Sequence, residues 1–131
     1  MREILFRGKT EEEGKWLEGD LFCNKSRRYI RYPEQETYYT HDKVLSETVG
    51  QYTGLTDKNG KKIFEGDIVK AQDDVFGSPF CDGIVGKVVY DETAFFIETA
   101  NIIDTQYLFN ECAVYEVIGN IHDNPELLKG E

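Results

Sequence analysis

Cysteine is scarce in this sequence, and its spacing argues against cysteine-based stabilisation. The three cysteines, Cys23, Cys81 and Cys112, are odd in number and stand 58 and 31 residues apart. A disulfide framework uses paired cysteines, and a zinc knuckle uses closely spaced ones. We therefore expect unpaired cysteines, no bound metal or cofactor, and the reducing environment of the cytoplasm.

Long apolar runs are also missing. No segment approaches the roughly 20 apolar residues that a membrane-spanning helix needs. The opening residues 1–7 lack an apolar core and a small-residue cleavage site, so they do not resemble a secretory signal. We expect a chain that is neither exported nor inserted in a membrane.

Positive charge is the third shortage, and it falls in the second half of the chain. The net charge is −10: residues 1–50 hold nine Lys and Arg against ten Asp and Glu, whereas residues 51–131 hold six against fifteen. A negative field of this kind repels nucleic-acid phosphates and anionic membrane surfaces. The sequence therefore predicts basic partners or a purely solubilising role for the acidic surface, with nucleic acid and membranes unexpected as partners.

Aromatic residues, by contrast, are abundant. Sixteen Phe and Tyr in 131 residues supply more apolar area than a disordered acidic chain carries. Apolar positions alternate or form runs of three to five, and none repeats with helical spacing over three turns. The pattern predicts a mainly β protein with few short helical turns. We expect one compact unit, with an N-terminal β-hairpin region over 1–48 and a second region over 49–131.

The first region holds several segments with the composition of strands. Residues 4–6 begin a strand that we expect to pair, across a polar turn over 9–15, with residues 16–22. Residues 29–32 and 37–40 are rich in aromatic residues and threonine, which favours two more short strands.

The tetrapeptide Asp-Lys-Asn-Gly at 57–60 is the clearest turn signal. Asn-Gly readily takes the two positive φ angles of a type I′ turn, whose twist matches that of the strands it joins. It is expected to connect a strand over 51–55 to one over 61–64, with a further strand over 68–70.

The remaining sequence predicts a meander and a short C-terminal turn. A polar loop and three strands are expected, in order, over 72–82, 85–90, 94–97 and 114–121. One helical turn is expected over 108–112. Asn124 is expected to cap a final turn beginning at Pro125, because proline has no N–H to leave unpaired there. Leu127 and Leu128 would then dock on the core.

Neither a phosphate-binding loop nor a hydrolase triad is supported. Gly54 and the Gly60-Lys61 pair are separated by five residues instead of four, and Lys62 stands where a hydroxyl should hold magnesium. The serines lack the flanking glycines of a nucleophile elbow: Ser26, Ser46 and Ser78. We therefore predict a hairpin around Gly60 instead of a nucleotide site.

The two histidines, His41 and His122, are candidates for activating a thiolate or binding zinc if the fold brings them to a cysteine. His122 precedes a turn over 123–125, and unpaired cysteines are usually buried as small hydrophobic residues. We predict structural roles for both residue types.

Three acidic pairs offer carboxylates for acid–base chemistry or cation binding: Glu65 with Asp67, Asp73 with Asp74, and Asp91 with Glu92. None has the spacing of a calcium loop. The second pair is expected in an exposed loop and the third in a hairpin turn. No catalytic, cofactor or metal residue is therefore assigned, the binding residues remain unknown, and the chain is not expected to be an enzyme.

One segment, residues 25–32, runs against the acidic background with four cations and two tyrosines. Such a mixture can bind single-stranded nucleic acid, with cations on phosphates and rings under bases. Strand alternation places Arg27, Tyr29 and Arg31 on one face and the residues between them on the other, which dilutes the cluster. We predict a charged edge strand.

Several blocks of sequence stand in a specific order: REILFRGK at 2–9, WLEG at 16–19, VGQYTGL at 49–55, DKNGK at 57–61, IFEGDIV at 63–69, EVIGNI at 116–121 and DNPELL at 123–128. Together they cover both termini and the centre. In this order they resemble the YopX family, small proteins encoded by bacteriophages and prophages of Gram-positive bacteria.

The resemblance implies a β-rich fold whose second half looks like a small SH3-like barrel, and a phage setting. It implies no activity and no catalytic residue. We expect a non-enzymatic accessory protein that binds an unidentified protein of the host or phage. The alternative is an acidic protein that imitates nucleic acid and inhibits a host DNA- or RNA-binding enzyme. A hydrolase that depends on cysteine and histidine is the third hypothesis.

Overall fold

The computed structural model describes residues 3–73, 84–91, 94–98, 106–107 and 113–128. Within these ranges strands dominate, helical structure is limited to short 3-10 turns, and the strands form two antiparallel sheets. The predicted mainly β class is therefore confirmed. The chain divides into two compact units, Met1–Gly54 and Leu55–Glu131. The division falls inside a strand, whereas the sequence suggested a boundary between residues 48 and 49.

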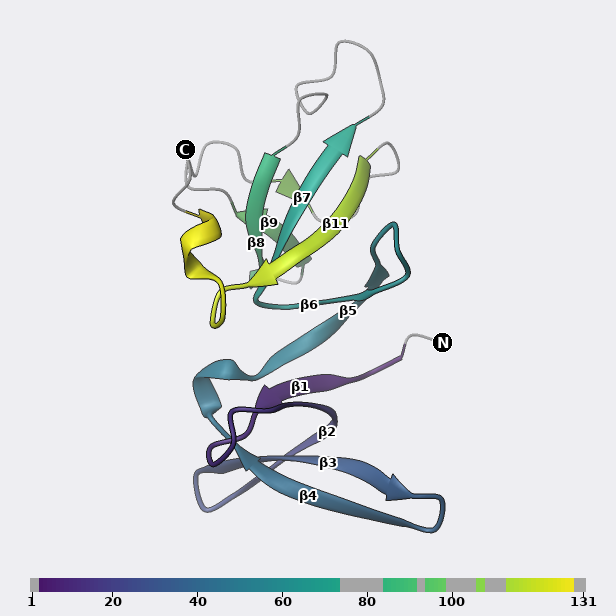
Figure 1. The fold of residues 1–131 in the computed structure, drawn as a ribbon, viewed down its shortest axis with the longest axis vertical. Helices are drawn as coiled ribbons and strands as arrows, with labels where there is room; N and C mark the ends of the chain where they lie inside the picture. Colours follow the sequence, from purple (N-terminus) through teal and green to yellow (C-terminus); the bar gives the residue numbers. More distant parts are fainter. Residues whose placement is uncertain (1–2, 74–83, 92–93, 99–105, 108–112, 129–131) are drawn as a thin grey trace. The chain divides into compact units, whose positions relative to one another are not determined.

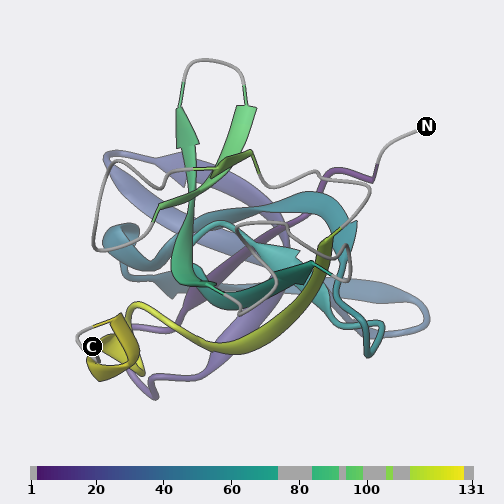
Figure 2. The ribbon, with the colours of Figure 1, turned by 90° about the horizontal axis from the view of Figure 1, so that it is seen from above.

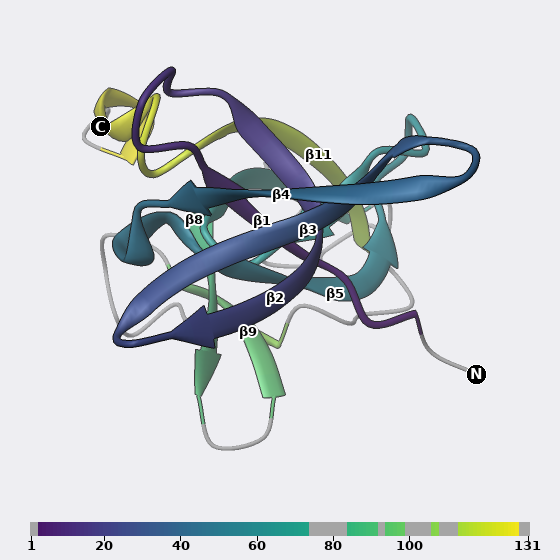
Figure 3. The same ribbon diagram turned by 90° about the horizontal axis from the view of Figure 1, so that it is seen from below.

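The first unit is built around an antiparallel sheet (Figure 1). Its elements are β1 (Phe6–Lys9), β2 (Trp16–Asn24), β3 (Arg27–Gln35), β4 (Tyr38–Val44), the 3-10 turn η1 (Ser46–Thr48) and the start of β5 (Gly50–Thr56). The strand order is β4-β3-β2-β1-β5, so β1 is paired on both sides. Figure 3 shows β2, β3 and β4 running side by side.

The N-terminal hairpin predicted from the sequence is confirmed. β1 and β2 pair from Phe6 opposite Gly19 to Lys9 opposite Trp16. The strand begins at Phe6, later than predicted. A Cβ atom at Gly19 would collide with the backbone carbonyl of Arg31, so the close approach of β2 and β3 requires glycine there.

The next two strands are longer than the segments 29–32 and 37–40 that the sequence indicated. β3 and β4 pair along almost their whole length, with a register shift between Pro33 and Gln35. The shift accommodates a proline, which has no N–H to donate to the ladder. β3 also pairs with β2 and is therefore an interior strand. The prediction of an edge strand is wrong, because the edge is occupied by β4.

The β2–β3 connection is a two-residue turn with both residues at positive φ. Lys25 has φ 52° and Ser26 has φ 69°, between the paired residues Asn24 and Arg27. These angles belong to a type I′ turn, which normally favours Asn and Gly. Neither residue is of that kind, which explains why the sequence did not indicate the turn type.

One face of this unit forms its core. Leu17, Ile30 and Val44 are buried, and the partly buried residues packed on them are Phe6, Leu21, Tyr32 and Val49. Each fully buried side chain of this size stabilises the fold by about 1.5–3 kcal/mol. Because successive side chains alternate, the opposite face of β2, β3 and β4 is left without this cover.

The second unit contains the rest of the strands and the last 3-10 turn. After the end of β5 come β6 (Lys62–Phe64), β7 (Asp67–Asp73), β8 (Ile84–Asp91), β9 (Ala94–Glu98), β10 (Gln106–Tyr107), β11 (Ala113–Asn120) and η3 (Pro125–Leu128). The predicted strands over 68–70, 85–90, 94–97 and 114–121 are confirmed as β7, β8, β9 and β11. In Figure 2 the hairpin of β8 and β9 is green and η3 is yellow.

The five-stranded sheet of this unit is open among the described residues. Its order is β10-β9-β8-β7-β11, with β10 and β11 at its two ends. In the described residues, the region for which an SH3-like barrel was implied is an antiparallel sheet, and no barrel closure is seen among them. Its core consists of Ile63, Val69, Ala71, Val88 and Ile97.

The β5–β6 hairpin lies where the sequence placed it, but its turn is not type I′. Gly60 has a positive φ of 81°, whereas Asn59 does not. The Gly60 N–H donates to the Asp57 carbonyl at 2.9 Å, and the Asp57 N–H donates to the Lys61 carbonyl at 2.8 Å. The two central residues therefore make an ordinary turn, and the glycine supplies the one left-handed position that closes the hairpin.

The C-terminal turn begins at Pro125, as predicted. Asn124, directly before it, accepts the Asn120 N–H on its side-chain Oδ1 at 3.2 Å and the Leu127 N–H on its backbone carbonyl at 3.1 Å. Leu127 and Leu128 are only half-buried. The predicted helical turn over 108–112 and most of the loop over 72–82 lie outside the described residues.

Candidate functional site

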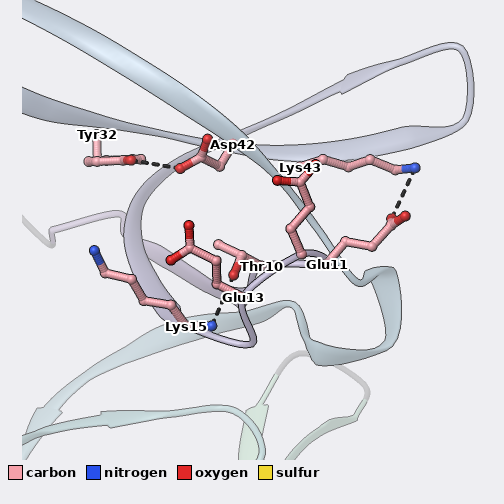
Figure 4. A pocket seen from close by; sticks show the side chains of 8 residues that line it. Thr10, Glu11, Glu13, Lys15, Tyr32, Asp42 and Lys43 are labelled. Carbon is pink, nitrogen blue, oxygen red and sulfur yellow. Dashed lines mark hydrogen bonds and ion pairs between the residues drawn. The ribbon is translucent and has the colours of Figure 1, made fainter.

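The first unit contains an open pocket with a volume of about 400 Å³ (Figure 4). It is lined by Thr10, Glu11, Glu12, Glu13, Lys15, Tyr32, Asp42 and Lys43. These residues come from the β1–β2 turn and from β3 and β4. The lining is mainly charged, which distinguishes it from the apolar pockets that hold most small organic ligands.

The β1–β2 turn is held in place by its own hydrogen bonds. Thr10 and Lys15 are joined by a backbone bond of 2.8 Å, and the Lys15 N–H also donates to the Thr10 hydroxyl at 2.9 Å. Gly14 takes a positive φ of 66° and donates to the Thr10 carbonyl. The turn therefore presents its three consecutive glutamates to solvent from a fixed backbone.

The opposite side of the pocket is fixed by Tyr32 and Asp42. The tyrosine hydroxyl donates to the Asp42 carboxylate at 2.7 Å (Figure 4). This hydrogen bond, together with burial, raises the pKa of Tyr32 to about 12. The phenol therefore stays protonated well above neutral pH and holds the carboxylate in one orientation.

The pocket has a negative charge balance. Four carboxylates, from Glu11, Glu12, Glu13 and Asp42, face two lysines. Lys43 pairs with Glu11 at 2.9 Å, and both side chains remain partly exposed. Pairs of this kind are exchanged easily for other partners. The pocket is therefore suited to a positively charged group.

A second feature of the same unit is the face of β2, β3 and β4 that lies opposite its core, which we call the outer face. The rings of Phe22 and Tyr29 stack with centroids 5.1 Å apart and an angle of 11° between them. His41 meets both rings edge-on, at 5.3 Å and 5.5 Å. Three strands thus contribute to one aromatic cluster.

Cations lie on the outer face beside these rings. The Arg31 guanidinium stands 5.4 Å from the centre of the Tyr39 ring and forms a 2.9 Å ion pair with Asp20. These contacts place Arg31 and Tyr29 on one side of β3, while Ile30 is buried on the other. The alternation predicted for residues 27–32 is confirmed.

The structure corrects the prediction for one cysteine. Cys23 is exposed on β2, where its Sγ contacts the Arg28 guanidinium. Phe22, the preceding residue, contacts His41 on the outer face, so alternation directs Cys23 to the opposite face. Cys23 and His41 therefore do not form a catalytic pair. Cys81 and Cys112 lie outside the described residues.

The other candidate nucleophiles and bases occupy unrelated places. Ser26 is in the β2–β3 turn, Ser46 begins η1, and both are exposed. His122 follows β11 at the predicted turn, where its backbone N–H donates to Asn120 Oδ1 at 3.0 Å. Ser78 lies beyond the part of the chain that the structure describes.

The acidic pairs divide into structural and undescribed residues. Asp67 is 1% exposed, and its Oδ2 accepts the Phe64 N–H at 2.7 Å, which closes the turn between β6 and β7. Glu65, in the same turn, is half-buried. Asp91 ends β8 on the surface, as expected for a hairpin. The structure does not describe the Asp73 side chain, Asp74 or Glu92.

Asp57 is an important buried carboxylate that the sequence did not single out. Its oxygens accept backbone N–H bonds from Asn59, Lys61 and Val117, at 2.9, 2.9 and 3.0 Å. Burial favours the neutral acid, but these three hydrogen bonds overcome that effect and lower the pKa of the Asp57 carboxyl. The available signal was an aspartate opening a turn, since such residues often bind the backbone just ahead.

The comparison with protein families decides the family. The model described as "YopX protein" matches residues 5–129. The chain belongs to the YopX family. The resemblance inferred from the sequence blocks is therefore confirmed.

A solved structure shares the YopX chain's fold. The crystal structure of protein EF1440 from Enterococcus faecalis is 28% identical, with a TM-score of 0.56, over 98% of this chain and 99% of that one. No curated protein matches the sequence. In the described part of this YopX chain, none of the helices is long and apolar enough to cross a membrane.

The pocket and the exposed cysteine and histidine of the first unit lie in different places. Among residues 3–73 and the later described segments, no three His, Cys, Asp or Glu side chains gather as metal ligands would. The pocket of this YopX chain supplies carboxylates and a phenol. The exposed Cys23 thiol and the exposed His41 imidazole do not line it. A polar, open site of this kind can hold a charged group by hydrogen bonds.

Proposed function

We propose that this YopX-family chain is a non-enzymatic accessory protein of a phage or prophage that binds a protein partner of the host or phage. In this proposal, the pocket of the first unit accepts a lysine or arginine side chain of the partner. The observation that carries the proposal is the arrangement of four carboxylates around a pocket whose walls are fixed by hydrogen bonds.

The chemistry of the pocket supports a guanidinium or ammonium group as the occupant. Hydrogen bonds between a cationic donor and a carboxylate are stronger than those between neutral groups. Glu12 and Glu13 are exposed on the rigid turn, and Asp42 faces them from β4. Because the pocket is open, the end of a long side chain can enter while the rest of its protein stays outside.

Peptide binding tests this proposal. Fluorescence anisotropy with a labelled arginine-containing peptide is expected to give saturable binding, which is lost when citrulline replaces arginine. Glu13→Gln and Asp42→Asn are each expected to weaken binding about tenfold to a hundredfold, because a charge-assisted hydrogen bond is worth about 1.5–3 kcal/mol.

Glu36→Gln serves as the matched control, since Glu36 is an exposed carboxylate of the same unit and does not line the pocket. It is expected to leave the affinity unchanged. Equal binding of the citrulline peptide, or an equal loss with Glu36→Gln, would contradict the proposal.

A further inference from the structure

We propose that the outer face of β2, β3 and β4 binds single-stranded nucleic acid. This goes beyond the protein-binding function proposed above and uses a different surface. The sequence suggested that alternation along β3 dilutes its cations. The structure alters that reasoning, because β2 and β4 add aromatic rings to the face that holds Arg27, Tyr29 and Arg31.

The aromatic residues of this face are arranged as a platform. Phe22 and Tyr29 stack, His41 closes against both, and Tyr39 lies one row further along beneath Arg31. Phe22 is 36% exposed and Tyr39 is 62% exposed. Unpaired bases stack on such rings without a strong sequence preference, because every base has an aromatic face.

Cations accompany the rings on the same face. Arg31 comes from the middle of β3 and Arg27 from its start. Arg31 pairs with Asp20 at 2.9 Å. The two side chains of this pair are 54% and 57% exposed, so a phosphate can displace the carboxylate at little cost.

The charge and the exposed rings of the outer face favour single-stranded nucleic acid over a duplex. The cations are complementary to phosphates, and the rings need unpaired bases, which a duplex keeps stacked inside. The first fifty residues have nearly balanced charge, whereas the excess of acid lies in residues 51–131. The acidic remainder repels phosphates, so we expect a short site and an affinity that falls steeply with salt.

Oligonucleotide binding tests the inference. Anisotropy of a labelled oligothymidylate at low salt is expected to show saturable binding that is tighter than binding of a duplex of the same length. Tyr39→Ala is expected to weaken it about tenfold, the effect of losing one stacking ring. Arg27→Glu is expected to weaken it and to reduce the slope of log affinity against log salt by about one.

Tyr90→Ala is the matched control, because Tyr90 is a similarly exposed tyrosine, 53% accessible, in β8 of the second unit. It is expected to leave oligonucleotide binding unchanged, and circular dichroism verifies the fold of each variant. Absence of saturable binding, equal binding of the duplex, or equal losses in Tyr39→Ala and Tyr90→Ala would overturn the inference.

The two binding assays distinguish the two proposals. Glu13→Gln is expected to weaken binding of the arginine peptide and to leave binding of the oligonucleotide unchanged. Tyr39→Ala is expected to have the reverse effect. If Tyr39→Ala weakens a peptide while no oligonucleotide binds, the outer face is a protein surface and the nucleic-acid inference is wrong.

Discussion

The two units differ in where their described carboxylates lie, because the buried ones are both in the second unit. In the first unit, charged and aromatic side chains lie in the open, around the pocket and on the outer face. In the second unit, Asp57 and Asp67 are 7% and 1% exposed and accept hydrogen bonds from the backbone. An antiparallel sheet with one solvated face leaves polar residues available for partners, whereas a buried carboxylate is committed to the fold.

This difference changes the meaning of the acidic composition. The second half carries most of the excess acid, yet Asp57 and Asp67 are buried there. Two more carboxylates pair with lysines, Glu116 with Lys58 and Glu98 with Lys87. The net charge therefore overstates the free negative surface of the described residues. The hypothesis of a nucleic-acid mimic stays a prediction, because many of its carboxylates lie outside them.

The largest expected effect is the loss of the buried carboxylate of the second unit. Asp57→Ala removes the acceptor of three backbone N–H groups, those of Asn59, Lys61 and Val117. An unsatisfied buried donor costs about 1–3 kcal/mol, so we expect a loss of about 3 kcal/mol or more in the free energy of unfolding, measured with urea.

Asp42→Ala is the counterpart in the first unit, where the carboxylate is exposed and binds only the Tyr32 hydroxyl in the contacts above. It is expected to cost less than about 1 kcal/mol. Equal losses in the two variants would break the comparison between the units.

The pH dependence of stability provides a second test of Asp57. Its folded pKa is lowered below the ordinary 3.8, so its stabilising contribution is complete above that pH and is lost as pH falls through the lower folded value. Stability of the wild type is therefore expected to approach that of Asp57→Asn as the solution is acidified below pH 3.8. A constant difference between them would show that the carboxylate charge is not the cause.

A smaller effect is expected at the two hairpin turns. Ser26→Gly in the first unit relieves a side chain held at φ 69° and is expected to stabilise by about 0.5 kcal/mol. Gly60→Ala in the second unit forces a Cβ atom to φ 81°, where no neighbour stands within 4 Å, and is expected to destabilise by about 1 kcal/mol. Thermal unfolding of both variants measures these effects, and changes of the same sign would contradict the assignment.

The smallest effect on the fold is expected at Tyr32, which we propose to follow by tyrosinate absorbance. With its hydroxyl bound to Asp42, its pKa is raised to about 12. Asp42→Asn is expected to return the pKa towards about 10, with little change in the unfolding midpoint. An unchanged titration would show that burial, and not the hydrogen bond, holds the proton.

The sequence predicted strands well and contacts poorly. Hairpins around residues 9–15 and 57–60 followed from alternating apolar residues and turn formers close together in the chain. The turn type at 57–60 did not follow. The Asp57 carboxylate accepts hydrogen bonds from two N–H groups of the turn and from the N–H of Val117, and Val117 is far away in the sequence. Cys23 was expected to be buried, but its direction depends on the strand register.

The sequence by itself determined the all-β class, the acidic excess and most of the strands, because these depend on composition and on residues within a few positions of one another. The order of its sequence blocks indicated the YopX family. Only the tertiary structure decided which polar groups are available. The register of β2, β3 and β4 brings Phe22, Tyr29 and His41 together. A shift of one residue would reverse every side chain, and pairing between distant segments sets that register.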